Sequence, residues 1–294
     1  MSKGKTALKV SAATVAGSVG VAAAACALIA PRHRNARLRQ RWEALSVYRY
    51  AHRGLHDNDS PAPENSLAAF RRARDLGYGS ELDVHLSADG VPVVIHDSKL
   101  ERACGVEGQV ECLTVEQLQQ LRLFGSEERI PLFADVLELY EAGEGTCPPL
   151  VVELKTAKNN YAELCEKAMA LLDAHEVPYC VESFDPRVLL WLRRNRRDVI
   201  RGQLSEHFRR DEGSDLGFVR ASLGAALVSN VVGRPDFVAY RFEHRHHPAV
   251  LLACGPLGAW RVYWTVGNRD DLHRADLSDA VSIFEGFSPE PMRA

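Results

Sequence analysis

The sequence has no excess of basic residues. Its 294 residues include 36 lysines and arginines against 39 aspartates and glutamates, which leaves a formal net charge of −3. A nucleic-acid-binding domain needs a basic surface to neutralise phosphates, so nucleic acid is not expected as a partner. The hydrophobic fraction of 46% is that of a globular protein. The length fits one domain of about 250 residues with a short extension.

The sequence also lacks paired cysteines. No two of the seven cysteines have the CxxC spacing that is typical of zinc sites. An odd number of scattered cysteines indicates free, mostly buried thiols in a reducing compartment. The alternative is a disulfide between Cys104 and Cys112, if the domain is exported.

No glycine-rich phosphate loop follows the first β-rich segment, and a doubly wound sheet would often carry one at its switch point. Instead, several short apolar runs end in polar side chains, and helical patterns over 66–76, 162–174 and 186–194 separate them. Strands that alternate with helices predict parallel βα units. Functional groups at the ends of several different strands predict a (β/α)8 TIM barrel.

The N-terminus has the one long run without charge, the 21 residues from Val10 to Ala30. That length can cross a bilayer, so we predict a membrane anchor and basic linker over 1–45 and the barrel over 46–294. An arginine excess after the run favours a cytoplasmic barrel. An extracytoplasmic barrel is the alternative. A signal peptide is the rival reading, because Ala25-Cys26-Ala27 resembles a cleavage site.

The most informative segment runs from Glu81 to Asp97. Side chains at i and i+2 of a strand share a face, so Glu81 and Asp83 present two carboxylates together. Asp89-Gly90 is a strong signal for a two-residue hairpin turn, which would place Asp83 opposite His96. Two carboxylates beside an imidazole predict a divalent-metal site with a proton-transfer group.

Seven short motifs, in this order, resemble those of the glycerophosphodiester phosphodiesterases across residues 47–290: His52-Arg53-Gly54, Glu64-Asn65-Ser66, Glu81-Leu82-Asp83-Val84, Asp89-Gly90 with Pro92 to Asp97, Glu153-Leu154-Lys155, Glu182-Ser183-Phe184 and Trp264-Thr265. Each motif alone is weak, but the ordered set is specific. The resemblance implies a TIM-barrel hydrolase that cuts glycerophosphodiesters into glycerol 3-phosphate and an alcohol with a divalent cation.

The resemblance also implies a role for each candidate residue. Glu81, Asp83 and Glu153 would hold the cation, and such an oxygen-rich set suits Ca²⁺ or Mg²⁺. His52 and His96 would be the acid–base pair, in an order that the sequence leaves open. Substrate and phosphate would contact four further residues, Arg53, Lys155, Glu182 and Trp264.

Alternatives stay open for several of these residues. Arg53 could instead form only a salt bridge with Glu64, and Trp264 could simply pack in the core. His85 shares the strand face of Glu81, so it either contacts substrate or projects from the hairpin.

The family pattern implies a small insertion near the mouth at 98–129. The chain departs from the pattern after its last predicted strand, 280–284, where Glu285 stands in place of an aspartate. A helix over 35–45 could cover the seam there.

Two other functions are compatible with these residues. A lysophospholipase D-type activity would be favoured if an anchor kept the mouth near lipid. A non-catalytic, membrane-tethered phosphate-binding barrel is the second, although the complete residue set argues against it.

Overall fold

The computed structural model describes residues 30–31, 36–141, 147–206, 227 and 229–292. Eight parallel strands form a closed barrel, because β1 pairs with both β2 and β9. The strands are β1 (Tyr50–Ala51), β2 (Gly79–Leu86), β4 (Leu150–Leu154), β5 (Tyr179–Ser183), β6 (Arg201–Ser205), β7 (Phe237–Arg241), β8 (Trp260–Val266) and β9 (Val281–Phe284). The predicted TIM barrel is therefore confirmed.

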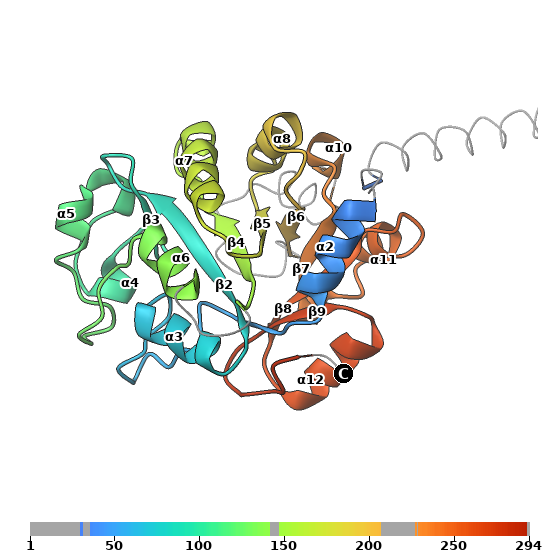
Figure 1. Cartoon of the computed structure of the whole chain (residues 1–294), viewed down its shortest axis with the longest axis horizontal. Helices are drawn as coiled ribbons and strands as arrows, with labels where there is room; N and C mark the ends of the chain where they lie inside the picture. Colours follow the sequence, from blue (N-terminus) through green and yellow to red (C-terminus); the bar gives the residue numbers. More distant parts are fainter. Residues whose placement is uncertain (1–29, 32–35, 142–146, 207–226, 228, 293–294) are drawn as a thin grey trace, which may run out of the picture.

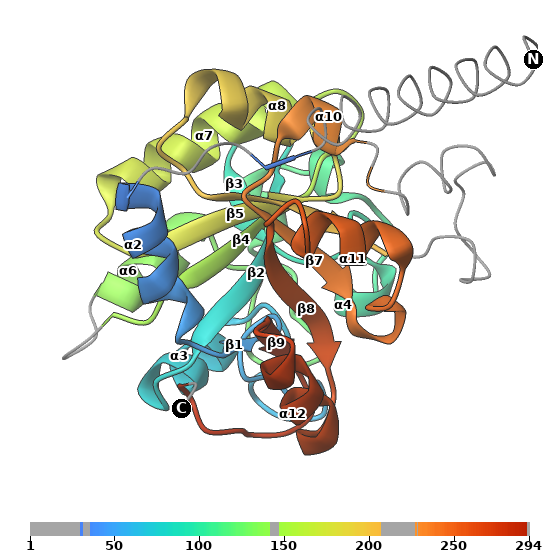
Figure 2. The ribbon, with the colours of Figure 1, turned by 90° about the vertical axis from the view of Figure 1, so that its right-hand side faces the viewer.

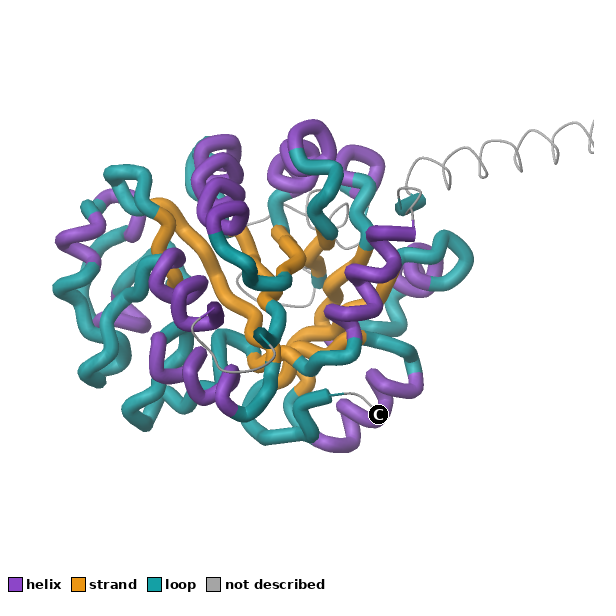
Figure 3. The backbone as a smooth tube through the Cα atoms, in the orientation of Figure 1, coloured by secondary structure: helices purple, strands orange, loops and turns teal. Residues whose placement is uncertain are grey.

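Helices surround the strands, as the tube in Figure 3 shows. They are α3 (Leu67–Asp75), α6 (Phe133–Glu141), α7 (Tyr161–Ala174), α8 (Pro186–Asn195), α10 (Asn230–Gly233), α11 (Pro248–Cys254) and α12 (Arg269–Leu277). Local chemistry fixes their starts. The Ser66 side chain accepts a hydrogen bond from Ala69 N at the start of α3, and Asp185 caps α8, whose first residue is Pro186.

The helix α2 (Ala36–Ser46) spans the end of the stretch predicted as a linker and the first residue predicted for the barrel, and it packs against the barrel (Figure 2). Its Trp42 stacks on Trp260 with ring centroids 4.6 Å apart and on Phe237 at 5.5 Å. Those two residues are the first residues of β8 and β7, so α2 covers the end of the barrel at which the strands begin. The division of the chain at residues 45 and 46 stays a prediction.

The predicted membrane anchor, and with it the membrane-anchored cytoplasmic location, must be corrected. In the part of the chain that the structure describes, no helix is both long and apolar enough to cross a bilayer. The apolar run at 10–30 lies outside the described residues except for Ala30. Cys104 and Cys112 are free thiols.

The hairpin register also differs from the prediction. The short strand β3 (Pro92–Val94) pairs antiparallel with β2, with Val84 opposite Val94. The backbone N–H of Ile95 donates to the Asp83 carbonyl at 3.0 Å, so Ile95, not His96, is opposite Asp83. The loop has three residues and Gly90 adopts a left-handed φ of +75°. This is the conformation of a three-residue hairpin with a glycine bulge.

The insertion at 98–129 contains α4 (Glu101–Cys104), the 3-10 helix η1 (Val110–Cys112) and α5 (Val115–Leu118). In Figure 1, α4 and α5 lie at the left of the view, next to β3. It has a small hydrophobic core of its own, built on Val93 and Ile95 of the hairpin and on Leu100, Leu118 and Leu123 of the insertion. The insertion is thus fixed to the hairpin that carries the candidate site.

Candidate active site

Three buried carboxylates meet at the ends of two neighbouring strands. Glu81 and Asp83 lie on β2, and the register places Glu153 of β4 beside Asp83. One oxygen of each carboxylate lies within 4.8 Å of the others. The next strand adds Glu182, which is paired with Glu153 and is also buried. The spacing of the ligand atoms and the purely oxygen donor set are compatible with a hard divalent cation.

The electrostatics of this cluster favour a bound cation. Burial, together with the charges of Asp83 and Glu153, raises the pKa of Glu81 well above its usual range. Burial also raises the pKa of Glu153 to about 7, against the opposing charge of Lys155. Buried carboxylates this close repel each other when ionised. A divalent cation between them would remove that repulsion, so the residues fit a metal.

Two cationic side chains border the carboxylates. The Lys155 Nζ lies 3.1 Å from Asp83 Oδ1 and 2.9 Å from Glu153 Oε2. Arg53 lies 3.5 Å from Asp83 through its Nε, and its NH1 donates to Glu64 at 2.9 Å. The predicted salt bridge between Arg53 and Glu64 therefore exists, but Arg53 also lines the cavity, so the two interpretations are compatible.

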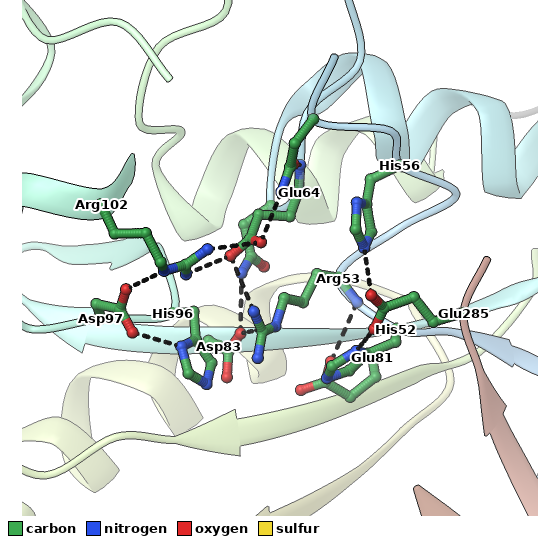
Figure 4. A network of polar contacts seen from close by, with 12 residues as sticks. His52, Arg53, His56, Glu64, Glu81, Asp83, His96, Asp97, Arg102 and Glu285 are labelled. Atoms are coloured by element: carbon green, nitrogen blue, oxygen red, sulfur yellow. Dashed lines mark hydrogen bonds and ion pairs between the residues drawn. The ribbon is translucent and has the colours of Figure 1, made fainter. Parts of the chain in front are cut away.

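The first histidine, His52, is oriented by a carboxylate. Its Nδ1 lies 2.5 Å from Glu285 Oε2, and its Nε2 lies 3.9 Å from Glu81 Oε2 (Figure 4). The hydrogen bond to His52 lowers the pKa of Glu285, so Glu285 is an ionised acceptor. His52 must then carry a proton on Nδ1. Its Nε2 is left to face the carboxylate cluster.

The second histidine, His96, has a matching arrangement. Its Nδ1 lies 2.7 Å from Asp97 Oδ1. The hydrogen bond to His96 holds the pKa of Asp97 well below its usual range, so this carboxylate is also an acceptor. Burial lowers the pKa of His96 itself, against the opposing charge of Asp83. Each histidine thus uses Nδ1 to contact a carboxylate and keeps Nε2 for another partner.

Arg102, from helix α4 of the insertion, contacts two carboxylates at once. Its Nε donates to Asp97 Oδ2 at 2.5 Å, and its NH1 and NH2 donate to Glu64 at 2.9 and 2.7 Å. Burial acts to raise the pKa of Glu64, but the hydrogen bonds from Arg102 and the charge of Arg53 outweigh it and lower this pKa to about 2. Figure 4 shows the resulting chain of contacts.

A cavity of about 540 Å³ opens at the mouth of the barrel beside the carboxylate cluster. Both predicted histidines line it, as do Arg53, Lys155, Glu81, Glu153, Glu182 and Trp264. Its aromatic wall is formed by Phe184 and Trp264, whose rings meet edge to face at 5.8 Å. Asp83 is 1% exposed and does not line the cavity itself. It contacts Arg53 and Lys155, which do line the cavity.

The comparisons with known proteins agree with this geometry. Residues 52–284 match the sequence profile of the Glycerophosphoryl diester phosphodiesterase family. The chain belongs to this family. A glycerophosphodiester phosphodiesterase from Caldanaerobacter subterraneus subsp. tengcongensis is 31% identical over 234 residues, which are 76% of this chain and 87% of that protein.

Other relatives are more distant or match in part. Glycerophosphodiester phosphodiesterase 1 of Mus musculus is 31% identical over 47% of this chain and 46% of its own length. The fold resembles that of an Oleispira antarctica phosphodiesterase solved in complex with the product sn-glycerol-3-phosphate (TM-score 0.63, 21% identical, covering 83% and 94% of the two chains). A glycerophosphodiester phosphodiesterase from Parabacteroides distasonis has a TM-score of 0.61 and 21% identity, covering 82% and 92%. At these identities, the structural likeness shows the fold alone.

In this member of the family, His85 does not line the cavity. It is 3% exposed, its Nδ1 lies 2.7 Å from Glu111 Oε1, and its Nε2 lies 3.2 Å from the carbonyl oxygen of His96. His85 therefore joins the insertion to the loop that carries His96. Neither predicted alternative fits, because His85 is buried against the insertion and neither lines the cavity nor projects from the hairpin.

The sequence reasoning missed several charged residues of the site. Three of them, Glu206, Arg241 and Glu243, line the cavity, and Asp97 and Arg102 lie behind it. Asp97 directly follows His96, and a carboxylate next to a candidate proton-transfer group was a usable signal. No sequence pattern pointed to Arg102. It lies on a four-residue helix of the insertion, and only the folded structure places it next to Asp97 and Glu64.

Proposed function

We propose that this chain hydrolyses glycerophosphodiesters to sn-glycerol 3-phosphate and an alcohol, in a reaction that depends on a divalent cation. One observation carries the proposal: three buried carboxylates, two cationic side chains and two carboxylate-oriented histidines meet at the mouth of one barrel. The name and 87% coverage of the Caldanaerobacter relative support the same substrate class.

Glu81, Asp83 and Glu153 would hold the cation, with Ca²⁺ or Mg²⁺ as the candidates. When bound, it would neutralise charge that develops on the phosphate oxygens. Arg53 and Lys155 line the same cavity and bind the phosphate from its other sides. The Arg53 guanidinium suits two-point contact with phosphate oxygens, and the Lys155 ammonium acts as a point charge.

The two histidines take the two proton-transfer roles. One accepts the proton of the glycerol 2-hydroxyl as this oxygen attacks phosphorus, and the other protonates the alcohol oxygen as its bond to phosphorus breaks. The product of this step is a cyclic phosphate, which water then opens with the two roles reversed. His52 and His96 suit these roles because both keep Nδ1 occupied by a carboxylate, which fixes the tautomer that presents Nε2.

Phe184 and Trp264 form an apolar wall for the carbon skeleton of glycerol. Glu182 is 2% exposed and its Oε2 has no hydrogen-bond partner, although the residue lines the cavity. A buried polar atom without a partner is costly. Burial raises the pKa of Glu182 well above its usual range, so its carboxyl group would share a hydrogen bond with a glycerol hydroxyl or with a water held by the cation, as its strand-end position predicts.

Product analysis tests the proposal against its alternatives. Purified full-length chain, supplied with Mg²⁺ or Ca²⁺, is incubated with glycerophosphocholine and, separately, with lysophosphatidylcholine. Mass spectrometry should find glycerol 3-phosphate and choline from the first substrate. Turnover of lysophosphatidylcholine alone would indicate a lysophospholipase D-type activity, and no turnover of either would leave a non-catalytic barrel.

A further inference from the structure

We infer that Arg102 is a positioning residue that holds both His96 and Arg53 in place for the reaction. The inference rests on the proposed function, in which these two residues transfer a proton and bind the phosphate. Arg102 itself lines no part of the cavity, so it would act only through other residues.

The contact to His96 runs through Asp97. The two oxygens of this carboxylate have different partners, since Oδ1 accepts from His96 Nδ1 at 2.7 Å and Oδ2 accepts from Arg102 Nε at 2.5 Å. Asp97 is the residue after His96 and its side chain is 28% exposed, so solvent competes for it. The guanidinium of Arg102 fixes the carboxylate plane and therefore the ring of His96.

The contact to Arg53 runs through Glu64. Arg102 binds both Glu64 oxygens, and Arg53 NH1 donates to Oε1 of the same carboxylate at 2.9 Å. Asn58 also holds Glu64, through its side-chain amide at 3.1 Å and by accepting from the Glu64 backbone at 2.9 Å. One chain of contacts thus runs from Arg53 through Glu64, Arg102 and Asp97 to the ring of His96, and the four charged groups in it alternate in sign.

Only an arginine can make these contacts together. Nε, NH1 and NH2 of Arg102 each donate to a carboxylate oxygen, whereas lysine offers a single nitrogen on a flexible stem. The insertion supports this geometry. The Arg102 guanidinium lies 5.5 Å from the centre of the Phe124 ring, and Phe124 N donates to the Ala103 carbonyl at 2.7 Å. The insertion therefore contributes a side chain that orders the site.

The test compares Arg102→Met and Arg102→Lys with Arg122→Met. Arg122 is a matched control because it lies in the same insertion and pairs with the 87% exposed Glu127, away from the cavity. Arg102→Met should lower kcat on glycerophosphocholine about 10- to 100-fold, as loss of an orienting partner typically does. KM should also rise, because Glu64, which holds Arg53, loses the two hydrogen bonds from Arg102 and keeps those with Asn58 and Arg53. Arg102→Lys should recover part of the loss, and Arg122→Met should match the unmodified protein.

Two further measurements separate positioning from a general effect on folding. Long-range ¹H–¹⁵N spectra should show the Nδ1–H tautomer of His96 in the unmodified protein and a tautomer mixture in Arg102→Met. Asp97→Asn combined with Arg102→Met should lower kcat by little more than Asp97→Asn alone, since both changes reach His96 through the Asp97 carboxylate, whereas the route through Glu64 should affect KM.

Unchanged kcat, KM and His96 tautomer in Arg102→Met would overturn the inference. So would equal losses in Arg102→Met and Arg122→Met, because the loss would then follow any change to the insertion. The spectra need no turnover. If the unmodified protein hydrolysed no diester, the proposed function would fail, whereas the His96 tautomer would still decide whether Arg102 positions this ring.

Discussion

The Lys155 Nζ lies 2.9 Å from Glu153 Oε2, although the two side chains are proposed to serve phosphate and metal respectively. The same ammonium lies 3.1 Å from Asp83 Oδ1. Burial works to lower the pKa of Lys155, but the charges of Asp83 and Glu153 outweigh it and raise this pKa, so the ammonium is protonated. Lys155 would therefore compete with a divalent cation for Asp83 and Glu153, two of the three proposed ligands.

We predict that Lys155→Met binds Ca²⁺ and Mg²⁺ several-fold more tightly while it loses activity. Removal of the ammonium frees the carboxylates and removes a positive charge beside the metal. Calorimetric titration at several pH values separates metal affinity from proton competition, because burial raises the pKa of both Glu81 and Glu153. Lys158→Met, which changes an exposed lysine of the following loop, should bind metal as the unmodified protein does. Weaker metal binding by Lys155→Met would contradict this account of the site.

The metal ligands and the histidines should respond differently to added cation. Replacing Glu81, Asp83 or Glu153 with Ala should weaken metal binding, so excess cation should restore part of the rate. His52→Ala and His96→Ala should each lose about 10²–10⁴-fold in rate through lost proton transfer, with no rescue by metal. Rate measurements over a range of Mg²⁺ or Ca²⁺ concentrations check this division.

The leaving group separates the acid from the base. p-Nitrophenol departs without protonation, so with a p-nitrophenyl diester the variant that lacks the acid should recover most of its rate. The variant that lacks the base should stay slow. Equal losses for His52→Ala and His96→Ala on both the choline and the p-nitrophenyl substrates would refute separate roles.

Glu285 should be needed to orient His52. Its Oε2 lies 2.5 Å from His52 Nδ1, and its Oε1 lies 3.8 Å from His56 Nε2. Glu285→Gln removes the charge that stabilises the Nδ1–H tautomer, so kcat should fall at least about 10-fold with little change in KM. Glu290→Gln, an exposed change near the same end of the chain, serves as the control. Full activity of Glu285→Gln would show that His52 needs no such partner.

The ionised side chain of Glu64 should stabilise the folded protein at pH values above the pKa that Glu64 has in the unfolded chain. Its carboxyl has a pKa of about 2 in the folded protein against 4.5 otherwise, so its contribution is complete above pH 4.5 and is lost as pH falls towards 2. The difference corresponds to about 3 kcal/mol. In urea titrations, Glu64→Gln should flatten the fall of unfolding free energy between pH 4.5 and 2, and Glu127→Gln should keep the slope of the unmodified protein. An unchanged slope in Glu64→Gln would contradict the lowered pKa.

Much of the barrel was predictable because its strands and helices follow local periodicity. Predicted helices at 66–76, 162–174 and 186–194 correspond to α3, α7 and α8 within a residue at most. Strand-end carboxylates were predictable for the same reason, since the alternation of a strand places Glu81 and Asp83 on one face. The parallel pairing of β2 with β4 then brings Glu153 beside them.

The hairpin register was not predictable from local sequence. Asp89-Gly90 favours a two-residue turn, but the loop makes contacts that only the fold provides. Asp89 Oδ1 accepts from Val115 N of the insertion at 3.0 Å, and Ala88 N donates to the Leu113 carbonyl at 2.8 Å. These contacts with residues distant in the sequence stabilise the three-residue loop. The longer loop shifts the strand register by one residue, so Ile95 and not His96 lies opposite Asp83. The Arg102 contacts are missed for the same reason.

The most direct test of the central claim is the metal dependence of glycerol 3-phosphate release. The purified chain is treated with EDTA, dialysed and assayed on several head-group diesters, before and after addition of Mg²⁺ or Ca²⁺. We predict no release after EDTA and restored release with added cation, with far weaker restoration in the Asp83→Ala variant. Full activity in the presence of EDTA would contradict the assignment of Glu81, Asp83 and Glu153 as the ligands of a required cation.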